Sequence, residues 1–128
     1  MRQEDQKYAI RFRSRARLEL DEARVRLAEM TDLDHAVEWY NGFLDSLATL
    51  TDNPGRHLIA HENNYFRDTV HVYTYRLTAR GAAYQVYYTI VEFDQDAPFV
   101  TILHIRHGAR KPMTRAEARK IDEDSQNT

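Results

Sequence analysis

The chain has 128 residues, which is enough for one domain with its own hydrophobic core, and its 42% apolar and 30% charged residues are typical of a folded protein. It contains no cysteine, which excludes a disulfide framework, a thiolate metal site and a cysteine nucleophile. Its apolar stretches are too short for a signal peptide or a membrane span, so we expect a cytoplasmic protein that does not enter the membrane.

Charge is distributed unevenly along the chain, although the formal net charge is only -2. Residues 31–60 carry five acidic side chains and one basic one, whereas residues 101–120 carry six basic side chains and one acidic one. The small net charge argues against a general nucleic-acid-binding polyelectrolyte. The uneven distribution instead predicts a basic surface near the C-terminus.

The first half of the chain predicts one strand and two helices. Apolar and charged residues alternate over 8–13, as in a half-buried strand. Apolar residues then recur every three or four positions, which predicts one helix from about residue 14 to 30 and another from about 33 to 50. The short connection makes the two helices antiparallel, and Asn53-Pro54-Gly55 ends the second.

The second half predicts three strands, at 71–77, 84–93 and 99–106, with a hairpin turn at Ala79-Arg80-Gly81. Thr114-Arg115-Ala116-Glu117 opens a short C-terminal helix. The order βααβββα predicts an α+β fold, a single small domain with two N-terminal antiparallel helices packed on a mainly antiparallel sheet. We expect a flexible N-terminus at 1–7, the domain at 8–120 and a flexible polar tail at 121–128. Strand 8–13 should lie at a sheet edge, and 84–90 and 103–105 in the centre.

Alternation along the strands predicts which residues face the helices. With Leu103 and Ile105 toward the helices, the residues between and beside them point away. The same reasoning turns Tyr73, Tyr75 and Tyr88 toward the core. The opposite face, which we expect to be open, then gathers Arg76, Gln85, Tyr87, His104 and Arg106.

An open face with cations and imidazoles suits an anionic ligand. RNA cleavage is one chemistry it could host, because attack by the 2′-hydroxyl needs a base, an acid and fixed positive charge. The candidates for these roles are His104, His107, Arg76 and Arg110. The alternative is a sheet face that arginine and tyrosine side chains simply shield from water.

Two other patterns have simpler explanations. His57 and His61 are four residues apart beside Glu62, but Asn53-Pro54-Gly55 makes this stretch a loop, so we expect solvated side chains rather than a metal site. The acidic positions of the second helix could attract a basic partner, although a solvated helix face is the simpler interpretation.

The order of elements, with Tyr84-Gln85-Val86-Tyr87-Tyr88-Thr89-Ile90 on a central strand and Ile102-Leu103-His104-Ile105-Arg106 on the last, resembles the RelE/ParE superfamily of bacterial toxins. The segment His107-Gly108-Ala109-Arg110 is the most specific part and is similar to the end of the final strand in ParE-type members. The resemblance covers roughly residues 8–112.

The resemblance implies the toxin of a type II toxin–antitoxin (plasmid-stabilisation) system, without metal or other cofactor. The partners it implies are a cognate antitoxin and either DNA gyrase, for a ParE-like toxin, or the ribosome and its mRNA, for a RelE-like endoribonuclease. A homodimer or a heterotetramer with the antitoxin is compatible with it. A non-toxic binding module that keeps the fold is the third alternative.

The resemblance also ranks the site residues. Arg110 and Arg76 match basic residues of RelE-type nucleases, whereas Gln85 stands in place of a RelE arginine, Thr74 in place of a lysine, and no tyrosine follows Tyr88. These departures remove a phosphate clamp and an acid or base, and therefore favour the ParE-like activity. We expect the functional residues to be Arg110, Arg76, His107 and His104, with Gln85, Tyr87, Arg106 and Lys111 as the surrounding surface.

Overall fold

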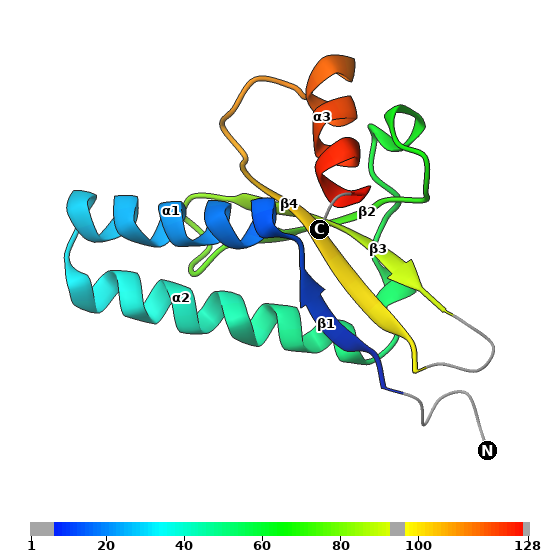
Figure 1. Ribbon diagram of the computed structural model, residues 1–128. Coiled ribbons are helices and arrows are strands. Elements are labelled where there is room, and N and C mark those ends of the chain that lie inside the picture. The colour runs from blue at the N-terminus through cyan, green and yellow to red at the C-terminus, as the bar shows by residue number, and fades with distance from the viewer. Residues whose placement is uncertain (1–6, 93–96, 127–128) are drawn as a thin grey trace.

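The computed structural model describes residues 7–92 and 97–126 and shows an α+β domain (Figure 1). The strands are β1 (Ala9–Phe12), β2 (His71–Tyr75), β3 (Tyr84–Val91) and β4 (Phe99–His107). The helices are α1 (Ser14–Met30), α2 (Leu33–Ala48) and α3 (Arg115–Gln126), with three single-turn 3-10 helices, Thr49–Thr51, Pro54–Arg56 and Asn63–Tyr65, between α2 and β2. The predicted fold class and order of elements are confirmed.

The four strands form one sheet in the order β1-β4-β3-β2. Strands β2, β3 and β4 are antiparallel neighbours, whereas β1 runs parallel to β4. The sheet is therefore mainly antiparallel, β1 lies at an edge, and β3 and β4 are central, as predicted.

The helical pair covers one face of the sheet (Figure 1). Helix α2 begins where the Asp32 carboxylate accepts a hydrogen bond from the His35 N–H at 2.7 Å, a typical N-cap. Its buried residues recur at helical spacing and form a core with α1 and the sheet. Tyr75 and Tyr88 belong to this core, as predicted.

A β-bulge in β4 changes the predicted orientation of one core residue. Tyr87 pairs with His104 but the next residue, Tyr88, pairs with Ile102, so Leu103 is the extra residue on β4. Ile105 packs toward the helical pair as predicted, whereas Leu103 belongs to the apolar cluster on the opposite face. The prediction that Leu103 faces the helical pair is therefore wrong.

The opposite face of the sheet is also covered, by α3 and by the segment 58–70 (Figure 1). A second apolar cluster fills this layer; its buried members are Ala60, Phe66, Val70, Tyr87, Leu103, Met113, Ala118 and Ile121. The expectation of an open polar face is therefore wrong, because strand alternation predicts which side chains share a face but not what packs on it.

The C-terminal boundary also differs from the prediction. Residues 121–126 continue α3 and Ile121 is buried, so they are not a polar tail. The tail predicted at 127–128 and the flexible N-terminus predicted at 1–6 lie outside the described residues. Among the described helices, none is long and apolar enough to cross a membrane.

Candidate functional site

Three of the predicted site residues are buried beneath α3 and the 58–70 segment. His104 is 2% exposed, Arg106 4% and Tyr87 2%. Each occupies a sheet position that the alternation predicted to be open. These residues therefore have partners within the protein instead of facing a solvent-filled site.

Both ring nitrogens of His104 lie close to charged groups. Its Nδ1 is 2.7 Å from the Glu19 carboxylate of α1, and its Nε2 is 3.4 Å from Arg106 Nη1. Because a guanidinium can only donate, Nε2 of His104 accepts the hydrogen bond from Arg106. His104 thus links α1 to the layer beneath α3.

Arg106 joins β4 to α3. Its guanidinium donates to both oxygens of the Glu117 carboxylate, at 3.1 and 3.4 Å, and to the Lys111 carbonyl at 2.5 Å. The hydrogen bond from Arg106 is the main cause that lowers the pKa of Glu117, with smaller contributions from the Thr114 backbone and Arg110, while burial acts in the opposite direction. Glu117 and Thr114 also form a reciprocal capping box at the start of α3, as the sequence predicted.

The Tyr87 phenol is held as a hydrogen-bond donor. It donates to Glu62 at 3.1 Å and lies 3.3 Å from the amide oxygen of half-buried Gln85. Burial raises the pKa of Tyr87, and the neighbouring Glu62 carboxylate raises it further. A phenol in this environment keeps its proton and is a poor general base.

Two exposed candidates, Arg110 and Lys111, lie on the turn that follows β4. Gly108 N–H donates to the Ala83 carbonyl at 2.7 Å, and a side chain at Gly108 would meet that same carbonyl at 3.1 Å. The His107 Nδ1 accepts a hydrogen bond from Ala109 N–H, and Arg110 N–H donates to the His107 carbonyl. These backbone contacts give the exposed Arg110 a fixed direction, and exposed Lys111 follows it.

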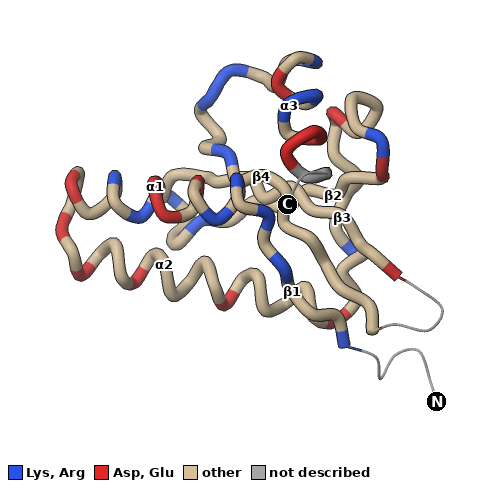
Figure 2. The backbone as a smooth tube through the Cα atoms, in the orientation of Figure 1, with Lys and Arg blue, Asp and Glu red and all other residues tan. Residues whose placement is uncertain are grey.

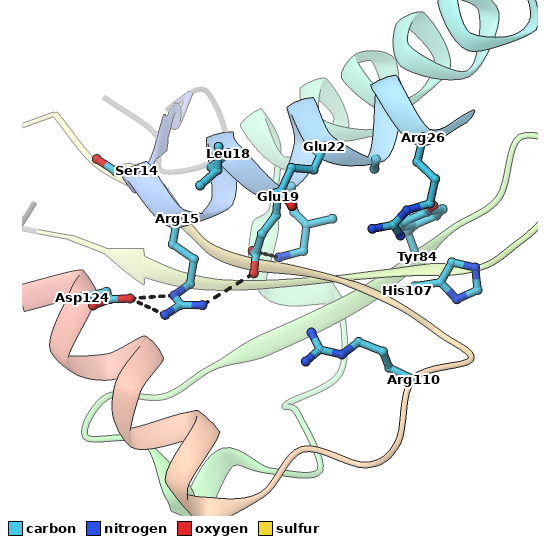
Figure 3. Close-up of a pocket in the computed structure, with 12 residues that line it drawn as sticks. Ser14, Arg15, Leu18, Glu19, Glu22, Arg26, Tyr84, His107, Arg110 and Asp124 are labelled. Atoms are coloured by element: carbon cyan, nitrogen blue, oxygen red, sulfur yellow. Dashed lines mark hydrogen bonds and ion pairs between the residues drawn. The ribbon is translucent and has the colours of Figure 1, made fainter. Parts of the chain in front are cut away.

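The turn borders a pocket of about 760 Å³ between α1 and the end of β4 (Figure 3). Tyr84 and Ile105 of the sheet line it, with Leu18 and Ala23 from α1. Charged and polar side chains complete the lining: Ser14, Arg15, Glu19, Glu22, Arg26, His107, Arg110 and Asp124. The pocket therefore combines an apolar lining with charges of both signs.

Some of these charges are already neutralised. Arg15 pairs with Asp124 and lies 3.8 Å from Glu19 (Figure 3). Arg110 lies 3.2 Å from Glu117, but that carboxylate also has the buried Arg106 as its partner. Arg110 can consequently turn to another anion without leaving Glu117 unpaired.

Tyr84 and Arg26 also line the pocket, although neither is among the predicted site residues. The Tyr84 ring packs edge-on against His107 with ring centroids 5.0 Å apart, and burial raises its pKa while Arg26 opposes the shift. The four charged residues of α1 that line the pocket, Arg15, Glu19, Glu22 and Arg26, follow one another at spacings of four, three and four. These charged residues form a second stripe on α1, beside its apolar stripe. This spacing is the sequence pattern from which the contribution of α1 to the pocket could have been predicted.

Arg76 does not line this pocket. It follows β2 and donates to the Gly81 carbonyl at 3.0 Å within the β2–β3 connection. Tyr75 pairs with Tyr84 and Tyr84 pairs with His107, so Arg76 is at the same end of the sheet but two strands away, about 10 Å. The structure thus brings Arg110 and His107 together and places Arg76 two strands away. His104 and Arg106 are buried, and Arg106 shares the Glu117 carboxylate with Arg110.

Among the described residues, no three His, Asp or Glu side chains are grouped so as to hold a metal ion. Comparison of the chain with protein-family models, with curated proteins and with solved structures finds no match.

Proposed function

We propose that the chain is the toxin of a bacterial type II toxin–antitoxin pair and that it inhibits growth in the ParE manner, by binding DNA gyrase in the cytoplasm. The burial of His104, Arg106 and Tyr87 is the observation that supports this choice over RNA cleavage. A nuclease needs its acid, base and phosphate-binding groups within reach of the substrate. Here His104 lies between Glu19 and Arg106, Arg106 binds Glu117 of α3, and Tyr87 donates to Glu62.

Binding to a protein surface needs only an exposed, preorganised patch. Arg110 on its fixed turn, beside the apolar lining of Tyr84 and Leu18, has the composition of such a patch. An arginine can hold a carboxylate with two hydrogen bonds while the apolar lining receives a neighbouring side chain. We further propose that a cognate antitoxin keeps the protein inactive by covering this patch.

The test compares the wild-type chain, Arg110→Ala and the exposed-arginine control Arg80→Ala after induction in cells. We expect wild type and Arg80→Ala to stop growth, reduce gyrase supercoiling and accumulate cleavage complexes. Arg110→Ala should fold normally and do none of these, because loss of a central arginine weakens an interface by about 30-fold or more.

Two outcomes would overturn the proposal. Codon-spaced mRNA cuts that disappear in His107→Ala, with gyrase unaffected, would assign the protein to the RelE-like endoribonucleases. Unchanged growth on wild-type expression, with no antitoxin-sized partner co-purifying, would favour a non-toxic binding module.

A further inference from the structure

The outer surface of α2 carries an apolar stripe that the fold leaves uncovered. Leu33, Val37 and Leu44 are 68%, 49% and 38% exposed and follow one another at spacings of four and seven, so they share one face of the helix. This stripe is distinct from the buried stripe of α2, whose members pack on the sheet. Helix α2 therefore has two apolar faces, of which the domain core covers one.

A row of carboxylates runs beside the exposed stripe. Asp34, Glu38 and Asp45 each follow a stripe residue by one position, so they lie about 100° further round the helix. All three are exposed, and α2 contains no lysine or arginine, as its red and tan tube shows in Figure 2. Within the described part of the chain these three carboxylates form no ion pair, so the flank keeps its negative charge.

The other flank of the stripe is different. There Tyr40 packs on the core and the Arg24 guanidinium of α1 lies over its ring, 5.4 Å from the centroid. Arg24 also has Asp21 one turn earlier on α1, at 4.0 Å. Of the two flanks of the exposed stripe, the carboxylate row therefore lies on the one away from Tyr40 and Arg24.

The geometry points to a docking surface for a cationic amphipathic helix of a partner protein. Its apolar residues would pack on Leu33, Val37 and Leu44, and its lysines or arginines would face the carboxylate row. The stripe runs over the twelve residues from Leu33 to Leu44, about 16 Å along the axis, which matches about three turns of a partner helix. This inference is independent of the proposed function, since the stripe shares no residue with the pocket beside Arg110.

Charge also decides against two other occupants. Antiparallel two-fold pairing of α2 with a second copy would bring two carboxylate rows together, which is unfavourable. An anionic membrane surface would be repelled by the same row. Neither objection applies to a helix with basic flanking residues.

The test uses the full chain and a synthetic three-turn peptide with leucines on one face and lysines beside them. We expect saturable binding that weakens with salt, with amide shifts in nuclear magnetic resonance spectra confined to α2 and the adjoining face of α1. Asp34→Asn/Glu38→Gln/Asp45→Asn should weaken binding about tenfold or more. The control Glu29→Gln/Asp68→Asn/Glu123→Gln removes three exposed carboxylates elsewhere and should bind like wild type.

A second variant, Val37→Ser/Leu44→Ser, tests the apolar part and should also weaken binding while keeping the circular dichroism spectrum of the fold. Equal binding of a peptide with glutamates in place of the lysines would overturn the inference, as would equal weakening by the two carboxylate variants. Sedimentation that shows a wild-type dimer abolished by Val37→Ser/Leu44→Ser would overturn it in favour of a second copy.

Discussion

Arg106 and Arg110 bind the same Glu117 carboxylate but differ in burial, and this difference predicts separate roles. Arg106→Ala leaves His104 and the Lys111 carbonyl without a donor, so we expect the free energy of unfolding to fall by about 2–4 kcal/mol. Arg110→Ala removes an exposed pair and should cost less than about 1 kcal/mol. Urea denaturation measures both values, and equal losses would contradict the distinction.

Gly42 lies where α2 meets β2. A side chain at Gly42 would overlap the Tyr75 hydroxyl, which donates to the Trp39 carbonyl at 3.1 Å. Gly42→Ala should therefore lower the free energy of unfolding by about 1–2 kcal/mol, despite the better helix propensity of alanine. Gly55→Ala is the control, since its nearest neighbour is Ile90 Cδ1 at 3.9 Å, and its stability should stay close to wild type.

The environment of His57 predicts that the free energy of unfolding decreases in mildly acidic solution. Its ring stacks on Tyr73, and burial, followed by the positive charges of Arg56 and His71, lowers its pKa. The unfolded chain, with an ordinary histidine pKa of about 6.5, then binds the proton more tightly than the folded chain. Stability should fall as the pH drops through about 6.5 and level off below the folded pKa.

The measurement is urea denaturation of wild type and His57→Gln between about pH 7.5 and about pH 5. As the pH falls over this window, wild type should lose stability relative to His57→Gln, because only wild type carries the histidine that takes up a proton on unfolding. Glu117 does not interfere with this measurement. Because its pKa is lowered in the folded chain, the stability it contributes is lost only when the pH falls below about 4, the ordinary range of a glutamate. A difference that does not vary with pH would exclude the role given to His57.

At the scale of elements, α3 is held by few contacts. Ala118 and Ile121 are its buried apolar side chains, while Glu117, Asp122 and Asp124 pair with arginines of β4, the 58–70 segment and α1. Ile121→Ala should lower the stability of α3 by about 2–4 kcal/mol and speed amide exchange along this helix before the rest of the chain. Exposed Lys120→Ala is the matched control, and uniform exchange in the two variants would contradict this account.

The elements themselves were predictable because their signals are periodic. Alternation over 8–13 predicted β1, helical spacing predicted α1 and α2, and Thr114 with Glu117 predicted the start of α3. The bulge at Leu103 was not predictable, since β-branched and apolar residues continue through it without a glycine. The length of α3 was missed because Ile121 is a single apolar residue in a charged segment.

At the scale of the whole molecule, the candidate site was predicted only in part. The basic end near residues 106–120 and the turn with His107 and Arg110 could be read from local sequence. The burial of His104, Arg106 and Tyr87 could not be predicted from local sequence. It depends on the packing of residues 58–70 and α3 on β4, which are far apart in the chain. The role of α1 in the pocket depends on the same kind of long-range packing.

The pairing of β1 with β4 has a consequence for how the protein is made. Ala9 pairs with Phe99, so β1 must wait for about ninety further residues to be synthesised before its sheet neighbour exists. Contacts of such long range also slow folding, because the intervening loop must close first. Arg110 follows β4, and its turn rests on Ala83 of the finished sheet. A nascent chain therefore cannot present this surface until β4 and the turn after it have been synthesised and β4 has paired with β3.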